Sequence, residues 1–192
     1  MLLFLLFFSY FFDIIELRNI NNNTPQSQLF DSPIIQEWNE ATDDWSDIGT
    51  GTLLKKLTGY SVLYDQNRQR FISGNVLTGT QSRTLDATNN GWNLVGNPYP
   101  SAIDWERITV PQEISTTFYA YDAMTENFKL YQQGGVTLNQ GQQYILPAEA
   151  FFVNATGIDP TLNTDNESRI HFINSAKATK DINNLLTFRT SK

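Results

Sequence analysis

The chain contains no cysteine, which excludes disulfide bonds, zinc–thiolate sites and thiol nucleophiles together. It has one histidine, His171, and a single imidazole is a poor basis for a histidine metal site or a Ser-His-Asp arrangement. Basic residues are also few: 13 Lys and Arg stand against 20 Asp and Glu, giving a net charge of -7. Because a phosphate-reading surface needs clustered basic side chains, we expect no nucleic-acid partner.

Motifs for nucleotide cofactors and for nucleophilic catalysis are missing too. Neither Gly-x-Gly-x-x-Gly nor a Walker pattern occurs, and there is no Gly-x-Ser-x-Gly elbow. Asp104, Glu106 and Glu149 are carboxylates of the kind that glycosidases use, but nothing in their spacing selects a pair. We therefore expect no cofactor and no enzymatic activity, and a glycoside hydrolase fragment is the least favoured interpretation.

An acidic cluster with two tryptophans occupies residues 37–47. Such oxygen-rich segments can hold calcium, which takes six to eight oxygen ligands. The spacing does not match an Asp-x-Asp-x-Asp-Gly loop, and a solvated turn between two strands explains the cluster better. We predict no metal site here. The acidic residues concerned are Glu37, Glu40, Asp43, Asp44 and Asp47.

The only long apolar run is residues 1–12, which is shorter than the about 20 residues of a membrane-spanning helix. No basic residue precedes it and no small-x-small cleavage site follows it, so it fits a secretory signal poorly. It is an atypical signal or anchor, a buried first element, or a false start of the reading frame, and the last fits best. We divide the chain into this segment, residues 1–29, and a single module, residues 30–192, truncated at both ends.

The rest of the chain has the pattern of short strands. Aromatic and β-branched runs recur about every ten residues, separated by Gly, Asn and Pro, which is typical of a sandwich or barrel. Residues 59–64 with 70–72 predict one hairpin, and 116–121 with 128–131 predict a second. Further strands are expected at 150–154 and 169–172. The predicted fold is all-β: an antiparallel, jelly-roll-like β-sandwich.

Residues 91–105, GWNLVGNPYPSAIDW, are the most informative stretch. Trp92, Leu94 and Val95 predict a strand, and Pro98 ends it because proline lacks an amide hydrogen. Tyr99 lies between two prolines, so its ring is expected to be fixed in direction. Ser101 and Asp104 are candidate caps for a helical turn over residues 105–108.

This stretch, followed by residues 118–122 and by the Pro147-to-Val153 segment ending in Phe-Phe-Val, resembles a module of secreted and cell-surface proteins of Bacteroidetes-type bacteria. In those proteins the module lies in β-rich regions ahead of a type IX secretion C-terminal sorting domain, which is absent here. The resemblance implies an extracellular or outer-membrane surface location and, as partners, other domains of a parent protein. It brings no catalytic motif.

Two functions remain open. A non-catalytic structural or adhesive module is favoured, and it predicts that Trp92 and Trp105 are buried. The alternative is a carbohydrate-binding module with polysaccharide as its partner, because four Trp and eight Tyr provide flat faces that stack on sugar rings. It predicts two or more coplanar exposed rings. The candidate ligand-binding residues, chosen because they lie in turn-like segments, are Trp38, Trp45, Tyr99 and Trp105.

Overall fold

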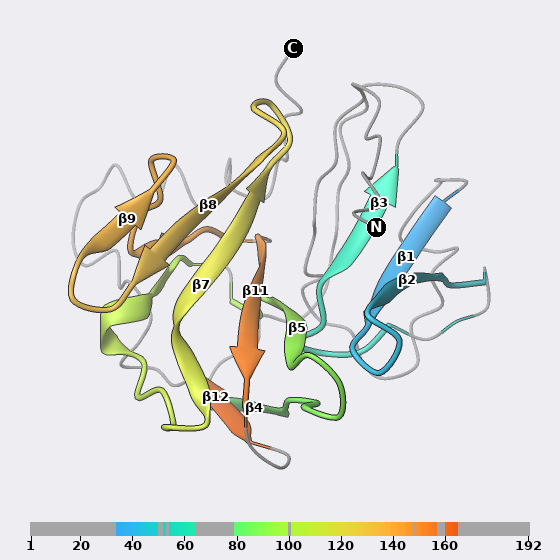
Figure 1. The fold of residues 1–192 in the computed structure, drawn as a ribbon, viewed down its shortest axis with the longest axis horizontal. Helices are drawn as coiled ribbons and strands as arrows, with labels where there is room; N and C mark the ends of the chain where they lie inside the picture. Colours follow the sequence, from blue (N-terminus) through green and yellow to red (C-terminus); the bar gives the residue numbers. More distant parts are fainter. Residues whose placement is uncertain are drawn as a thin grey trace.

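The computed structural model describes residues 34–49, 52, 54–63, 79–99, 101–147, 149–156 and 160–164. Within them the chain is all-β, and its strands pair in antiparallel sheets (Figure 1). The largest sheet has five strands in the order β5 (Trp92–Gly96), β11 (Ala150–Ala155), β7 (Ile114–Asp122), β8 (Asn127–Gln132) and β9 (Val136–Leu138).

Smaller sheets complete the structure. A three-stranded sheet has the order β2 (Asp44–Asp47), β1 (Ile34–Asn39) and β3 (Tyr60–Leu63). Two ribbons of two strands each join β10 (Tyr144–Ile145) to β6 (Ile103–Asp104) and β12 (Thr161–Thr164) to β4 (Gln81–Thr84). The 3-10 turn η1 (Trp105–Arg107) follows β6, and Asp104 caps it by accepting a hydrogen bond from the amide of Glu106, as the sequence predicts.

The main hydrophobic core lies on one face of the five-stranded sheet. Phe118 and Phe151 point into it from β7 and β11, and the Trp105 ring packs edge-on against both, at 5.4 and 5.7 Å between ring centroids. The remaining cover comes from the two ribbons and from the segment around Tyr99. Burial of these large rings away from water is the main favourable term for this layer.

The opposite face of the same sheet is covered over part of its area by the three-stranded sheet. Leu94 and Phe152 are buried there, and Trp38 and Trp45 pack over them. Strand β11 is therefore apolar on both sides, with Phe151 facing the main core and Phe152 facing the smaller sheet. Figure 1 shows the three-stranded sheet beside β5, on the side of the molecule away from β9.

The stretch of chain before β3 pairs with β5 of the larger sheet and continues into the smaller one. Thr58 forms a bridge with Val95, and the amide of Gly59 donates to the carbonyl of Leu94 at 3.2 Å, before the chain continues into β3. A Cβ on Gly59 would lie 2.6 Å from Leu94 Cγ, so a larger residue does not fit this close approach. Such a strand, shared between two sheets, forms a corner of the sandwich.

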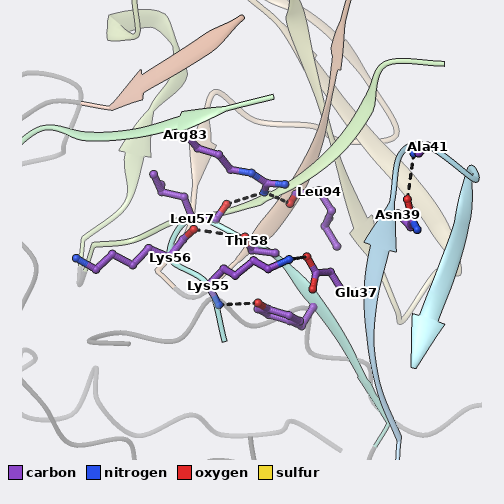
Figure 2. Close-up of polar contacts among 10 residues, drawn as sticks. Glu37, Asn39, Ala41, Lys55, Lys56, Leu57, Thr58, Arg83 and Leu94 are labelled. Carbon is purple, nitrogen blue, oxygen red and sulfur yellow. Dashed lines mark hydrogen bonds and ion pairs between the residues drawn. The ribbon is translucent and has the colours of Figure 1, made fainter. Parts of the chain in front are cut away.

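Arg83 fastens this corner. Its Nη1 donates to the carbonyls of Leu57, at 2.9 Å, and of Leu94, at 2.6 Å (Figure 2). These two residues lie on the two segments of the chain that meet at the corner. Burial lowers the pKa of Arg83 from its usual value, and the charge of Glu37 acts in the opposite direction. Figure 2 also shows Lys55 reaching Glu37, at 2.6 Å, beside the corner.

The predicted all-β antiparallel sandwich is confirmed. The hairpin predicted from residues 116–131 is present as β7 and β8. The predicted partner of residues 59–64 and the strand at 169–172 lie outside the described residues, as do residues 1–29 and His171.

Candidate interaction surface

A row of apolar side chains crosses all five strands of the large sheet on its second face. Direct cross-strand pairing places Leu94, Phe152, Tyr119, Leu130 and Leu138 on the same face. Their exposure rises along the row, from 2% at Leu94 and 8% at Phe152 to 57% at Leu138. The side chains are therefore of the kind found in a core along the whole row, but among the described residues the cover from the three-stranded sheet ends before β8.

We call the open part of this surface the β8–β9 face and define it by Phe128, Leu130, Val136 and Leu138. Phe128 is 44% exposed, Val136 56% and Leu138 57%, and Leu130 is half-buried. None of the four is charged, and the nearby Lys129 is turned to the opposite face, where it pairs with Asp122 at 2.7 Å. An uncharged exposed patch of this kind marks a site of interaction more often than a random surface does.

Strand β9 is an edge strand of the described sheet, and it lacks the usual protection. Edge strands commonly carry charged residues or proline, which deter pairing with other chains. Strand β2, at the edge of the smaller sheet, follows this rule with Asp44 and Asp47. Strand β9 reads Val-Thr-Leu, and all three residues are exposed.

Turn geometry holds β9 firmly against β8. Gly134 and Gly135 both have a φ of 92°, a left-handed conformation that suits glycine, and the amide of Gly135 donates to the carbonyl of Gln132 at 3.1 Å. Beyond the strand, Asn139 Nδ2 donates to the carbonyl of Phe128 at 2.9 Å. A Cβ on Gly141 would lie 1.9 Å from the carbonyl oxygen of Leu130, so the chain can approach β8 this closely only without a side chain.

Two of the four aromatic residues proposed from the sequence are core residues. Tyr99 and Trp105 are both 0% exposed. The hydroxyl of Tyr99 donates to the carbonyl of Gly79 or Thr164, at 2.8 and 2.9 Å, and Trp105 Nε1 donates to the carbonyl of Thr116 at 2.7 Å. With their rings enclosed and their polar atoms bonded, neither residue can stack on a ligand, and their assignment as ligand-binding residues is corrected.

The other two, Trp38 and Trp45, lie in strands and not in turns. They are direct cross-strand partners in β1 and β2, and both rings are half-buried against Phe152. The rings of Trp38 and Trp45 meet at 76°, and Trp38 Nε1 donates to the carbonyl of Trp92 at 2.9 Å. They serve mainly as the cover between the two sheets. Trp92, expected to be buried, is half-buried in the same cluster.

The candidate carboxylates are held by structural hydrogen bonds. Asp104 Oδ1 accepts from the amide of Glu106 and from Gln143, while Glu106 accepts from the Tyr131 hydroxyl and the amide of Gly134. The hydrogen bond to Glu106, together with burial, raises the pKa of Tyr131 to about 12. Burial also raises the pKa of Glu149, although the amide of Leu146 donates to its carboxylate.

The acidic cluster contains one buried member, Glu40. Its carboxylate crosses from the β1–β2 turn to the loop before β5 and accepts four hydrogen bonds there. The other members belong to the exposed hairpin or, in the case of Glu37, pair with Lys55. Across the part of the chain that the structure describes, no three His, Cys, Asp or Glu residues are grouped closely enough to hold a metal ion.

The sequence predicted β8, as part of the β7–β8 hairpin, but it predicted neither β9 nor the β8–β9 face. Phe128 and Leu130 alternate with Lys129 and Tyr131, and Val136 and Leu138 alternate around Thr137, which is the available signal. Alternation identifies two faces without telling which one is covered.

Comparison with known proteins gave no match to a protein-family model, to a curated protein or to a solved structure. In the described segments, no helix has the length and apolar character needed to cross a membrane.

Proposed function

We propose that this chain is a non-catalytic module with a structural or adhesive role in a larger secreted or surface-attached bacterial protein. The observation that carries the proposal is the β8–β9 face, an uncharged apolar surface at the edge of a well-packed sheet. The location outside the cell rests on the resemblance of residues 91–105 to modules of such proteins. Adhesion requires a surface of this kind and no catalytic group.

The arrangement of the carboxylates supports a non-catalytic role. Glu40, Asp104 and Glu106 each accept hydrogen bonds from neighbouring backbone amides. These contacts hold turns and strands in place, and they engage both oxygens of Glu40, Oδ1 of Asp104 and Oε1 of Glu106 in structural hydrogen bonds and not in the substrate contacts of a general acid or base.

Carbohydrate binding is the alternative, and the ring geometry favours it less. A sugar-binding platform needs exposed rings that are roughly coplanar. The half-buried pair Trp38 and Trp45 meets at 76°, and Tyr121 meets Phe128 at 66°. Edge-to-face packing of this kind stabilises the rings against one another but presents no shared flat face.

The test is retention of protein-coated beads on candidate surfaces. Beads carrying the full chain are washed over isolated bacterial envelopes, immobilised polysaccharides and collagen, and the retained fraction is counted. We expect retention on at least one surface and its loss in the Leu138→Ser variant. The matched control is Leu146→Ser, because Leu146 is also a leucine that is 57% exposed but lies outside the β8–β9 face.

Three results would contradict the proposal. Retention on none of the surfaces would remove the adhesive role. Equal losses in Leu138→Ser and Leu146→Ser would show that the β8–β9 face is not the contact. Competition by soluble polysaccharide, with quenching of tryptophan fluorescence, would favour the carbohydrate-binding alternative.

A further inference from the structure

We propose that β9 is a docking edge for one extended segment of another protein, a segment with alternating large apolar residues and a basic residue near its start. The segment adds as an antiparallel strand beside β9 and places its apolar side chains over the β8–β9 face. This inference rests on the proposed interaction function and names the chemistry of the partner. Main-chain hydrogen bonds supply affinity in this mode of binding, and alternate side chains supply specificity.

The edge itself is the first argument. The described sheet ends at β9 with no strand paired on its outer side, and Figure 1 shows β9 at the outer margin of the sheet. Val136 and Leu138 are both on the face that carries Leu130, whereas Thr137 is on the other face. A new strand continuing the sheet would therefore extend the apolar row of Leu130 and Leu138 by one position.

The small area of the face argues for a single strand and against a second copy of this chain. Phe128, Val136 and Leu138 are each about half exposed. Covering them removes on the order of 300 Å² from water, whereas a stable interface buries about 800 Å² per partner. Two copies would also bring together chains that each carry a net charge of -7.

The direction of β9 and a charge in the turn between β7 and β8 set the direction of the segment. Strand β9 runs from Val136, beside Gln132, to Leu138, beside Leu130, and so toward the turn between β7 and β8. The carboxylate of Glu126 lies in that exposed turn, close enough to Tyr121 to influence its ionisation. An antiparallel segment begins at the Leu138 end, so a basic residue near its start lies on the side of Glu126.

The experiment uses the full chain and the peptide Ac-Lys-Val-Thr-Val-Thr-Val-Thr-NH2, labelled with a fluorophore for anisotropy. The control peptide has proline in place of the two threonines that stand between valines, because the threonine opposite Thr137 makes the ladder hydrogen bonds to β9 and proline cannot donate one. We expect saturable binding of the first peptide and at least about tenfold weaker binding of the second. On the protein side, Leu138→Lys is expected to weaken binding about tenfold or more, and the matched variant Leu146→Lys less than about twofold.

Hydrogen exchange identifies where the peptide binds. Slower exchange at residues 136–138 in the presence of the peptide supports the proposal. Absence of binding, equal binding of the proline peptide, or equal effects of Leu138→Lys and Leu146→Lys would overturn it. If the free chain sediments as a dimer that Leu138→Lys dissociates, the occupant is a second copy and the proposal is wrong. If β9 and residues within 165–192 are protected together in the free monomer, the occupant is the chain's own tail, and the proposal is likewise wrong.

The outcome is separable from that of the bead experiment. Retention that depends on Leu138 but is accompanied by no peptide binding would leave the adhesive function in place and remove only the strand-docking mechanism.

Discussion

Glu40 is expected to make a large contribution to stability, because it joins the two sheets through a buried carboxylate. Only 4% of the surface of Glu40 is exposed to solvent. Oε1 accepts from the amides of Asn89, at 2.8 Å, and Gly91, at 2.7 Å, while Oε2 accepts from the amide and the hydroxyl of Thr88, at 3.1 and 2.7 Å. The perturbation we propose is Glu40→Gln, which keeps the size of the side chain.

The expected loss of folding stability follows from the hydrogen-bond donors that the Glu40 carboxylate serves. With the glutamine NH2 group at the position of Oε2, its carbonyl still accepts from Asn89 and Gly91, and the Thr88 hydroxyl can turn to accept from the NH2 group. The amide of Thr88 then loses its acceptor, and the remaining hydrogen bonds lose the charge that strengthened them. Since a hydrogen bond to a charged group contributes about 1.5–3 kcal/mol, we expect a loss of about 2 kcal/mol, which corresponds to a fall in the urea midpoint of about 1 M.

The effect should depend on pH in a defined direction. Burial acts to raise the pKa of Glu40. The hydrogen bonds from Thr88, Gly91 and Asn89 together lower it by more, so that the pKa lies below the usual 4.5. A carboxylate of this kind stabilises the fold fully above its unfolded pKa, and the contribution is lost as the pH falls through the folded pKa. The difference between wild type and Glu40→Gln should be constant near neutral pH and should shrink below pH 4.5.

The assay is urea unfolding followed by tryptophan fluorescence, at neutral pH and in acid. Glu37→Gln is the matched control, because it is the same change three residues earlier and affects a partly exposed ion pair worth at most about 1 kcal/mol. The reasoning is refuted if Glu40→Gln unfolds within about 0.5 kcal/mol of wild type at pH 7, or if its deficit is undiminished in acid.

Two further predictions concern glycine positions that require a positive φ and the arginine at the corner of the sandwich. Gly91 has a φ of 75°, and a Cβ there would lie 1.8 Å from the carbonyl oxygen of Ala155, so Gly91→Ala should cost more than about 3 kcal/mol in thermal or urea unfolding. Gly134→Ala, with a φ of 92° but no atom within 4 Å, should cost only about 1–2 kcal/mol, and equal costs would contradict the argument. Arg83→Met removes both hydrogen bonds at the corner of the sandwich and should cost about 2–3 kcal/mol. In hydrogen exchange the amides of Gly59 and Gly96 should lose protection first, and unchanged protection there would show that Arg83 does not fasten the corner.

Much of the fold could be predicted from local sequence. Proline and glycine ended the strand that begins at Trp92, and Asp104 capped the short helical turn, because both effects depend on residues within a few positions. The β7–β8 hairpin followed from alternation and a polar turn. The candidate site could not be predicted in the same way. Turn chemistry near Tyr99 and Trp105 indicated exposure, yet both rings are enclosed by segments distant in the sequence.

The sequence by itself determined the all-β class, the positions of the central strands β3, β5, β7, β8 and β11 and the absence of thiol chemistry, because strand period, turn residues and composition are local properties. Only the tertiary structure decided which aromatic faces are covered, that Glu40 is buried while its acidic neighbours are solvated, and that the apolar row ends uncovered at β9. The physical reason is that Phe151 and Phe152 are equally apolar in sequence, and that the cover of each depends on long-range packing of other strands.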